Sequence, residues 1–531
     1  MDLRQYQTEA VEAILAARRS GVRRMVVSLP TGAGKTVIFS HLARLARRQV
    51  LVLAHREELL EQAREKIARA MQSADVVAIE RGADRAPKDA RVLVCSIRSL
   101  HEERLARVVA GRDIGLVIYD ECHHAASDDN RRVLRQLGVF EDGYDGTLLG
   151  FTATTVRADG KGLDAVFERI VYARSLPQLI DDGYLAKLRG FRIATTADLR
   201  GLSGSGHDFA EEELAEAVDI EERNALVARS IQELARDRRT IAFCVTVGHA
   251  RNLSRALNHV GVPAGIVHGA MPSEQRARVL ADFREGRIHA LTNVGVLTEG
   301  FDDPGVSCIA MARPTRSDGL YAQCIGRGTR LASGKTDCLV LDFVDLSTLD
   351  LCTLPSLFGL PRHVDLRGDD ATDARRTWLR LEEEHPGFEV DPGAVTLAEI
   401  KERAESFDPL GLAPDAEVLA ISANAWFSLG RHGVGLHFQR AKGRTSEALV
   451  VAARGASKPA RGKRWEVRID GRTMDRFSRL EDAVAAVDFE IDRMGRLTAE
   501  SAREDASWRK GSVADELRLA LFERIAGSRR K

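Results

Sequence analysis

The sequence predicts an α/β protein with two tandem parallel-sheet domains, followed by a helical linker and a small α+β C-terminal domain. Two blocks of the chain alternate short apolar runs with amphipathic helical stretches, which is typical of parallel sheets covered by helices on both faces. A glycine-rich loop joins the first apolar run of the first block to a helical stretch. The tail differs, because it carries strand-like runs followed by one helical stretch.

Length and composition agree with a multidomain globular chain. At 531 residues it is too long for one hydrophobic core, and roughly three or four domains are expected. The 78 basic and 78 acidic residues balance, so any nucleic-acid surface must be local. The seven cysteines are scattered through apolar runs without a C-x-x-C pair, which favours core thiols in a reducing compartment and no zinc site. No signal core or membrane span is evident, and we expect a cytoplasmic protein.

The glycine-rich loop, residues 30–36 (PTGAGKT), predicts a phosphate-binding site. It follows the apolar run 25–29 and precedes a helical pattern. Small residues there let backbone N–H groups curl around phosphate oxygens at a helix N-terminus. Lys35 should reach the β- and γ-phosphates, and the Thr36 hydroxyl should complete a Mg²⁺ shell. The strict pattern has Gly where this chain has Leu29, so an ordinary glycine-rich turn is the alternative.

A second motif strengthens that prediction. The apolar run 116–119 ends in Asp120-Glu121-Cys122-His123. A carboxylate at the carboxyl end of a parallel strand can hold Mg²⁺ through water, and a neighbouring Glu can orient or deprotonate the attacking water. An isolated Asp-Glu pair would more often be a solvated turn. Beside the glycine-rich loop, the pair is interpreted as a Walker B motif that accompanies a Walker A motif.

The first block supplies further candidates at the ends of its six runs. The runs are 25–29, 50–53, 76–79, 92–95, 116–119 and 147–151. Gln7, on the opening helix, could pair with an adenine edge, with a surface helix position as the alternative. Arg56 and Ser96 follow the second and fourth runs, where they could bind polynucleotide phosphates or simply cap helices. The hydroxyls of Thr152 and Thr154 suit hydrogen bonding to the Asp120-Glu121 segment.

The second block has no phosphate loop of its own. Its runs are 240–245, 264–267, 290–294, 308–312 and 338–343. It carries TNVGVLTEGFDDP at 292–304 and QCIGRGTR at 323–330. Arg327 and Arg330, three apart, are expected on one helix face, from which both can point at a phosphate chain. An arginine supplied from a second domain can stabilise charge on the γ-phosphoryl group, whereas a solvated face is the alternative.

The ordered set LPTGAGKT, AHREEL, DECH, TAT, TNVGVLTEGFDDP and QCIGRGTR resembles the motor core of superfamily 2 helicases, of the DEAD/DEAH-like kind with a DECH box. The stretches LRQYQ and LIDDGYLAKLRG make the chain similar to the branch that contains RadD and XPB. The likeness covers about residues 1–350. It implies two RecA-like lobes with ATP in the cleft between them and a nucleic-acid strand across the top.

The resemblance also implies roles for the matching residues, with ATP and Mg²⁺ as cofactors. The nucleotide-binding set is Arg4, Gln7, Thr31, Gly32, Ala33, Gly34, Lys35, Thr36, Gly300 and Asp302. The catalytic set is Lys35, Asp120, Glu121, Gln323, Arg327 and Arg330, and the metal set is Thr36 and Asp120. The set expected on the nucleic-acid backbone is Arg56, Ser96, Thr246, Thr292 and Thr298. Thr155 replaces the usual Pro after TAT, and the cysteine cluster of the RadD tail is missing, so no zinc module is expected.

Beyond the motor core, composition alone guides the prediction. We expect an ATP-binding lobe at 1–185, a second lobe at 186–350, an acidic helical linker at 351–413 and a basic α+β accessory domain at 414–531. The tail shows strand-like runs at 426–429, 435–439, 448–452 and 464–469, then a helix at 480–491. Residues 464–488 distantly resemble AP2-type DNA-binding domains.

The accessory domain is locally basic. Residues 431–479 contain 13 Lys and Arg against 4 Asp and Glu, a balance that favours phosphate attraction but also fits a solvated face. Trp426, Phe438 and Trp465 could stack on bases, with core packing as the alternative.

The sequence therefore predicts an ATP-dependent helicase or translocase that acts on nucleic acid, preferably DNA in repair or recombination. An RNA-remodelling helicase, the motor of a restriction or defence assembly with a protein partner, and a non-translocating ATP switch stay open.

Overall fold

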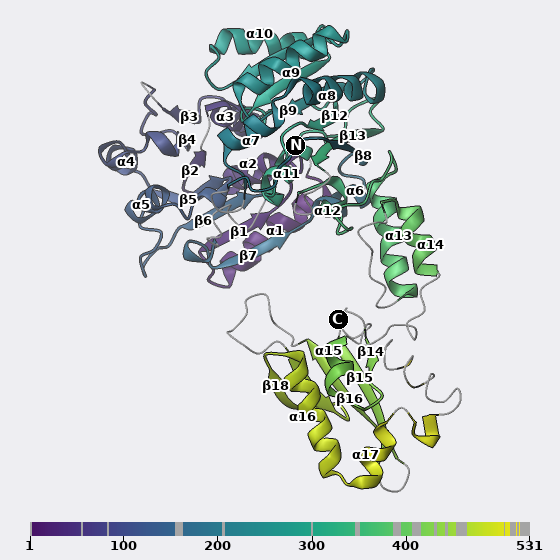
Figure 1. Ribbon diagram of the computed structural model, residues 1–531. Helices are drawn as coiled ribbons and strands as arrows, with labels where there is room; N and C mark the ends of the chain where they lie inside the picture. The colour runs from purple at the N-terminus through teal and green to yellow at the C-terminus, as the bar shows by residue number, and fades with distance from the viewer. Residues whose placement is uncertain are drawn as a thin grey trace. The chain divides into compact units, whose positions relative to one another are not determined.

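The computed structural model describes residues 3–54, 57–81, 84–153, 163–203, 208–298, 301–345, 351–385, 395–405, 416–429, 433–440, 444–452, 465–503, 505–509, 517 and 520. The chain divides into two compact units, Met1–Arg375 and Arg376–Lys531. The first unit contains two parallel α/β sheets and the second an antiparallel sheet with helices (Figure 1). The predicted fold class is confirmed. The finer domain boundaries stay predictions.

The first sheet has seven strands in the order β3-β4-β2-β5-β6-β1-β7, and all of its recorded pairings are parallel. The strands are β1 (Arg24–Ser28), β2 (Gln49–Ala54), β3 (Val77–Glu80), β4 (Val92–Ser96), β5 (Ile114–Asp120), β6 (Thr147–Thr152) and β7 (Arg169–Ala173). Each of the six predicted runs forms a strand. The edge strand β7 was not predicted.

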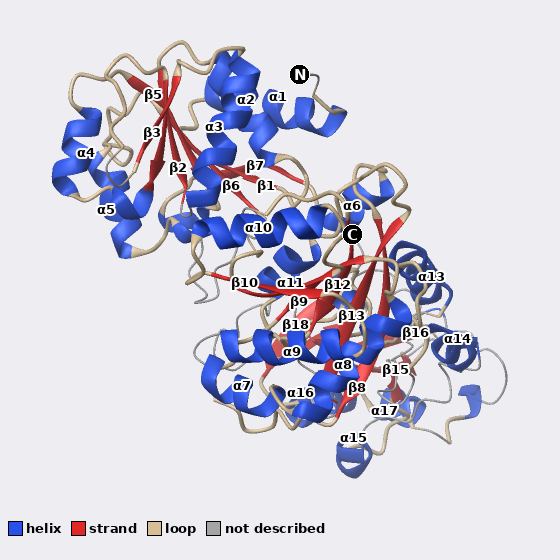
Figure 2. Ribbon diagram, turned by 90° about the horizontal axis from the view of Figure 1, so that it is seen from above, coloured by secondary structure: helices blue, strands red, loops and turns tan. Residues whose placement is uncertain are grey.

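Helices cover both faces of this sheet. In Figure 2, α1 (Gln5–Arg19), α2 (Lys35–Leu45) and α3 (Glu57–Met71) lie on one side, and α4 (Glu102–Val109) and α5 (Asp128–Gln136) lie on the other. On the α2 side the rings of Phe39 and Phe151 meet edge to face at 5.6 Å. Because both faces are packed, the central strands are buried and apolar over most of their length, with polar residues mainly at their ends. The short helix α6 (Leu176–Asp181) leads to the second lobe.

The second sheet has six strands in the order β10-β11-β9-β12-β13-β8, again with parallel pairings. The strands are β8 (Lys187–Thr195), β9 (Arg239–Phe243), β10 (Ala264–His268), β11 (Ala290–Val294), β12 (Val306–Met311) and β13 (Asp337–Asp345). The helices are α7 (Glu211–Val218), α8 (Glu221–Leu234), α9 (Val247–His259), α10 (Ser273–Arg284), α11 (Asp318–Ile325) and α12 (Leu354–Leu357). Figure 2 places α8 and α9 on one face of the sheet and α10 and α11 on the other.

The second unit is built on a five-stranded antiparallel sheet in the order β14-β15-β16-β17-β18. Its elements are α14 (Leu397–Glu405), α15 (Ala416–Ile421), β14 (Phe427–Ser428), β15 (Gly433–Gln439), β16 (Thr445–Ala452), β17 (Trp465–Ile469), β18 (Arg472–Phe477), α16 (Leu480–Arg493) and α17 (Arg496–Ala502). The helix α13 (Ala371–Glu384) spans the boundary of the two units. Trp426 and Phe438 are buried in the hydrophobic core, and Trp465 packs against it, so the core interpretation of these rings holds.

Two other expectations concern the whole chain. All seven cysteines are buried and unpaired, as the scattered spacing predicted. In the part of the chain that the structure describes, no helix has the length and apolar character needed to cross a membrane.

Candidate active site

A pocket of about 260 Å³ opens between the two lobes of the first unit, where β1 and β5 end. It brings together most of the residues predicted for nucleotide binding and catalysis. These are Arg4, Thr31, Gly32, Gly34, Lys35, Thr36, Asp120, Glu121, Asp302, Arg327 and Arg330. Five further residues that sequence reasoning missed also line it, namely Lys66, Tyr184, Leu185, Pro304 and Leu331.

The glycine-rich loop takes the sharp turn that its sequence predicts. Gly32 and Gly34 have φ angles of +87° and +71°, in the left-handed region that favours glycine. A Cβ on Gly34 would lie 2.8 Å from the Gln7 side chain, and one on Gly32 would lie 2.9 Å from Thr329 Oγ1 of the second lobe. Leu29, where the strict pattern has Gly, is fully buried and extends β1 by donating its N–H to Thr152 O at 2.9 Å. The departure therefore lies outside the phosphate turn.

Lys35 pairs with the predicted water-activating carboxylate. Its Nζ lies 2.9 Å from Glu121 Oε1, and His123 Nδ1 lies 3.4 Å from Glu121 Oε2. Burial alone would raise the pKa of Glu121, but Lys35 and His123 outweigh burial and hold this pKa well below its usual range. Glu121 is therefore ionised at neutral pH while Lys35 is beside it.

Glu121 also has an unusual backbone. Its φ of +51° lies in the left-handed region, which costs a non-glycine residue roughly 1–3 kcal/mol and is found disproportionately at functional sites. The Glu121 N–H donates to Asp120 Oδ1 at 3.1 Å, so this turn fixes the two carboxylates relative to each other. Asp120 and the Thr36 hydroxyl both line the pocket, and these hard oxygen donors suit Mg²⁺.

The opening helix lies beneath the loop. Gln7 does not line the pocket: its Oε1 accepts from the Arg4 N–H at 3.0 Å, and its Nε2 donates to Ala33 O at 3.4 Å. Arg4 does line it, donating to Tyr184 O at 3.0 Å with its guanidinium 5.9 Å from the Tyr184 ring centre. The centres of the Tyr184 and Tyr6 rings lie 4.7 Å apart. Tyr184 lies within the motif LIDDGYLAKLRG, but nothing in that motif alone indicated a pocket residue.

The paired arginines reach the pocket from a turn rather than a helix. The prediction of a shared helix face is wrong, because α11 ends at Ile325 and the backbone turns at Gly326 and Gly328. Gln323, within α11, is buried and is not part of the pocket lining.

Both arginine side chains hold the backbone of the preceding motif. Arg327 donates to Phe301 O and Thr298 O at 2.8 Å each. Arg330 donates to Phe301 O at 3.0 Å and pairs with Asp302 at 3.1 Å. Burial lowers the pKa of Arg330, although the charge of Asp302 acts in the opposite direction.

Asp302, which is predicted on the ribose side of the nucleotide, lines the pocket and also bridges the two lobes. Its second oxygen lies 3.0 Å from Lys66 Nζ, on α3 of the first lobe. Burial would raise the pKa of Asp302, but Arg330 and Lys66 outweigh it and lower that pKa. Lys66 belongs to an ordinary amphipathic helix, so no local signal in the sequence marked it.

Of the four described residues that are predicted on the nucleic-acid backbone, three are buried, namely Ser96, Thr292 and Thr298. Thr292 is fully buried and donates to Ala250 O at 2.9 Å, which leaves it no surface for a strand to contact. Thr246 caps α9 by accepting from the His249 N–H, and Thr298 donates to Gly295 O at 2.7 Å. Ser96 is buried at the end of β4. Arg56 and Gly300 lie outside the described residues.

The hydroxyls at the end of the sixth run were expected to bond to the Asp120-Glu121 segment, and the described contact is instead with the neighbouring His123. Thr152 Oγ1 lies 3.2 Å from His123 Nδ1, beside the carboxylate turn. Thr154 lies outside the described residues.

Comparisons with known proteins agree with this geometry. Residues 1–157 match the family model described as "Type III restriction enzyme, res subunit", and residues 222–332 match "Helicase conserved C-terminal domain". The protein named "Putative mitochondrial ATP-dependent helicase irc3" of Schizosaccharomyces pombe is 34% identical over 81% of this chain and 71% of its own. The "DNA 3'-5' translocase XPB2" of Sulfurisphaera tokodaii is 25% identical over 66% of this chain and 83% of its own.

A solved structure shows the same fold. The fragment of "a putative HsdR subunit of a type I restriction enzyme" from Vibrio vulnificus has a TM-score of 0.53 and 24% identity, over 69% of this chain and 70% of that one. Two parallel-sheet lobes with a phosphate loop and a DECH motif between them define an ATP-dependent motor of helicase superfamily 2. This chain belongs to the family of ATP-dependent helicases that includes irc3, and XPB2 is among its relatives.

Proposed function

We propose that the protein is a DNA helicase or translocase that hydrolyses Mg²⁺-bound ATP in the pocket between its lobes. The observation that carries this proposal is the meeting of Lys35 and Glu121, from the first lobe, with Arg327 and Arg330, from the second, around one pocket. Closure of the lobes on ATP and their release after hydrolysis would change the grip on a strand. The preference for DNA rests on the relative named as a DNA translocase.

The ion pairs in the pocket indicate how ATP would be received. Lys35 would leave Glu121 for the β- and γ-phosphates. Without that cation, the pKa of Glu121 would rise toward its usual range, and its carboxylate would become a better acceptor for a proton from water. Thr36 and Asp120 would hold Mg²⁺, which supplies charge neutralisation on the phosphates. Glu121 would thus become a stronger base only when a nucleotide is bound.

The second lobe would complete the site. Arg330 would exchange Asp302 and Phe301 O for the γ-phosphate, because a dianionic phosphoryl group attracts a guanidinium more strongly than a carbonyl or a singly charged carboxylate does. Asp302 would keep Lys66 as its partner across the cleft.

The substrate is tested by measuring ATP turnover and strand displacement on matched DNA and RNA duplexes with 3' or 5' single-stranded tails. We expect stimulation by DNA and displacement from the 3'-tailed DNA substrate. Equal or greater activity on the RNA duplexes would make the protein an RNA-remodelling helicase. Stimulation without displacement would leave a translocase, and a translocation assay with a labelled strand end would then report direction.

A restriction-assembly motor is the second candidate, favoured by the family model matched over residues 1–157. Such a motor acts together with a nuclease. Incubation of the purified chain with supercoiled plasmid, ATP and Mg²⁺ tests whether this chain has nuclease activity of its own. Linear product would show that it cuts DNA. Co-purification with a nuclease would support the assembly.

We propose that the basic C-terminal domain increases the affinity for nucleic acid. Its basic residues are not all equally available for phosphate contacts. Of the 13 basic residues in 431–479, seven lie outside the described residues. Among the described ones, several are already paired with acids. These pairs are Arg440–Asp470, Arg468–Glu466, Arg476–Glu466 and Arg479–Glu481.

Charge reversal to Glu of Lys442, Arg461 and Lys463, which belong to the basic stretch 431–479, is expected to weaken DNA binding and leave ATP turnover at saturating DNA unchanged. Each lost phosphate contact should reduce the slope of log K against log salt by about 0.7–0.9. Fluorescence anisotropy with labelled DNA across a salt series measures both quantities. Arg496→Glu is the control, because that exposed side chain pairs with Glu500 outside the basic segment. An unchanged slope in the triple variant would assign the tail to partner docking or to structure.

A further inference from the structure

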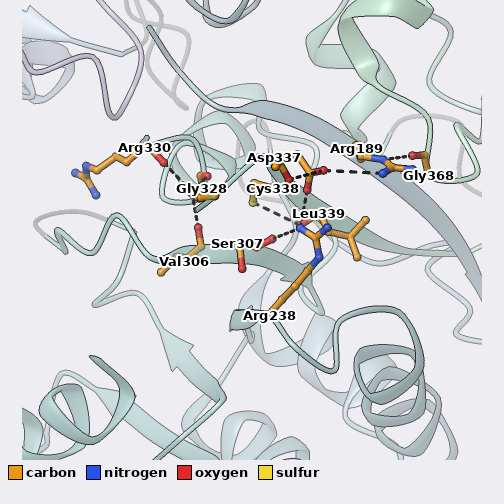
Figure 3. Close-up of polar contacts among 12 residues, drawn as sticks. Arg189, Arg238, Val306, Ser307, Gly328, Arg330, Asp337, Cys338, Leu339 and Gly368 are labelled. Atoms are coloured by element: carbon orange, nitrogen blue, oxygen red, sulfur yellow. Dashed lines mark hydrogen bonds and ion pairs between the residues drawn. The ribbon is translucent and has the colours of Figure 1, made fainter. Parts of the chain in front are cut away.

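Lys335, five residues after Arg330, joins two motifs of the second lobe. Its Nζ lies 2.6 Å from Gly328 O and 2.8 Å from Arg330 O. The same ammonium lies 2.5 Å from Val306 O and 3.3 Å from Pro304 O. An ammonium has three protons, so four carbonyls share them. Figure 3 shows Gly328, Arg330 and Val306 close to one another.

The four carbonyls belong to the two segments that also carry the arginine contacts. Gly328 and Arg330 are the first and last residues of the turn 328–330, which directly follows Arg327, whereas Pro304 and Val306 follow Asp302, which Arg330 contacts. The backbone of 298–306 thus accepts hydrogen bonds from three cations of one loop, Arg327, Arg330 and Lys335.

The three cations differ in what they face. Arg327 and Arg330 line the nucleotide pocket, so their side chains must exchange carbonyl partners to reach a phosphate. Lys335 lines a separate hollow at the start of β12 and β13, and Pro304 lines both this hollow and the nucleotide pocket. Its contacts can therefore persist while those of Arg330 change.

We propose that Lys335 is a positioning residue that holds the backbone of the turn 328–330 in place while the Arg330 side chain exchanges Asp302 for the γ-phosphate. This inference rests on the proposed function, because it requires Arg330 to act on the phosphate. The physical reason is geometric: a misplacement of about 1 Å at a reacting group can cost roughly 10²-fold in rate. Charge-assisted bonds to both ends of a glycine-containing turn prevent such a shift.

Arg238 offers a matched control at the same edge of the sheet. It donates to Ser307 O at 3.1 Å and pairs with Asp337 at 2.6 Å, as Figure 3 shows. Like Lys335, it is a half-buried cation that fixes the start of β12, and its side-chain contacts join this strand to β13. Its replacement should therefore lower stability without displacing Arg330.

The test compares Lys335→Met, Lys335→Arg and Arg238→Met by DNA-stimulated ATP turnover, ADP affinity, affinity for ADP with aluminium fluoride, and the midpoint of thermal unfolding. We expect Lys335→Met to lower kcat by about 10²-fold, to change ADP affinity by less than about threefold, and to lose the extra affinity for the transition-state mimic. Lys335→Arg should recover part of kcat, since it keeps the charge and donors. Arg238→Met should lose thermal stability at near-normal kcat.

Equal losses of kcat in Lys335→Met and Arg238→Met would overturn the inference, because general destabilisation would then explain both. A normal kcat in Lys335→Met would also overturn it. If Lys335→Met does not fold, Lys335→Gln, which keeps two donors, is measured in its place against the same criteria.

A double-variant cycle separates this inference from the proposed function. If Arg330→Ala leaves kcat unchanged, the proposed role of Arg330 fails, and the positioning role fails with it. If Arg330→Ala lowers kcat, Lys335→Met should add little in the Arg330→Ala background, because both changes disable one group. A full additional 10²-fold loss there would overturn the positioning role while the proposed function stands.

Discussion

Replacement of Glu121 by Gln is expected to lower kcat for ATP hydrolysis by about 10²- to 10⁴-fold, the usual contribution of a general base. The amide has nearly the same shape as the carboxylate but cannot take a proton from water. ATP should still bind, and its affinity should be kept or increased, because Lys35 would no longer leave an ion pair at 2.9 Å in order to meet the phosphates. Turnover assays and equilibrium binding of a fluorescent ATP analogue measure the two effects separately.

Lys35→Ala provides the contrast to this variant. It removes the cation that the phosphates need, so both nucleotide binding and turnover should be lost. A second control is His123→Asn, which removes the imidazole whose Nδ1 lies 3.4 Å from Glu121 Oε2. Because Lys35 remains beside Glu121, this change should lower kcat far less than Glu121→Gln does. Wild-type turnover in Glu121→Gln would exclude Glu121 as the group that activates water.

Arg330→Ala is expected to reduce turnover by about 10³-fold, the order of magnitude that arginine fingers contribute. The loss should appear in kcat, because the guanidinium is proposed to contact the γ-phosphate as charge develops. ADP affinity should change little, since ADP lacks that phosphate. Arg330→Lys should recover only part of the rate, because an ammonium lacks the planar fork of donors.

Arg327→Ala should lower turnover to a similar degree but also lower stability. Its side chain is 5% exposed and satisfies Thr298 O and Phe301 O, so truncation leaves two carbonyls without this donor. Arg239→Ala is the control, because Arg239 donates to Gly305 O at 3.2 Å in the same region yet is not part of the nucleotide pocket. Near-normal turnover in both Arg327→Ala and Arg330→Ala would make their contacts to the 298–302 backbone purely structural.

The strands that sequence analysis missed share a position in their sheets. β7, β8 and β18 are all edge strands. β18 is exposed along most of its length, and β8 includes Lys187, Arg189 and Arg192. Edge strands tolerate charged side chains, so β8 and β18 lack the apolar run that marks a central strand, whereas β7 (RIVYA) has such a run and was missed all the same. The central strands are packed on both faces, and their apolar runs were therefore visible in the sequence.

The sequence by itself determined the local shape of the phosphate loop and of the carboxylate motif. Residues 30–36 and Asp120-Glu121 are contiguous, and the turn or strand end that each requires is a local property of glycine and of apolar runs. Only the tertiary structure decided which side chains meet their partners across long stretches of the chain. Lys66 pairs with Asp302, 236 residues away, Arg4 reaches Tyr184 across 180 residues, and Thr292 turns its hydroxyl into the lobe. No local pattern encodes these contacts, because each joins segments that are far apart in the sequence and meet only when the sheets, helices and loops pack together.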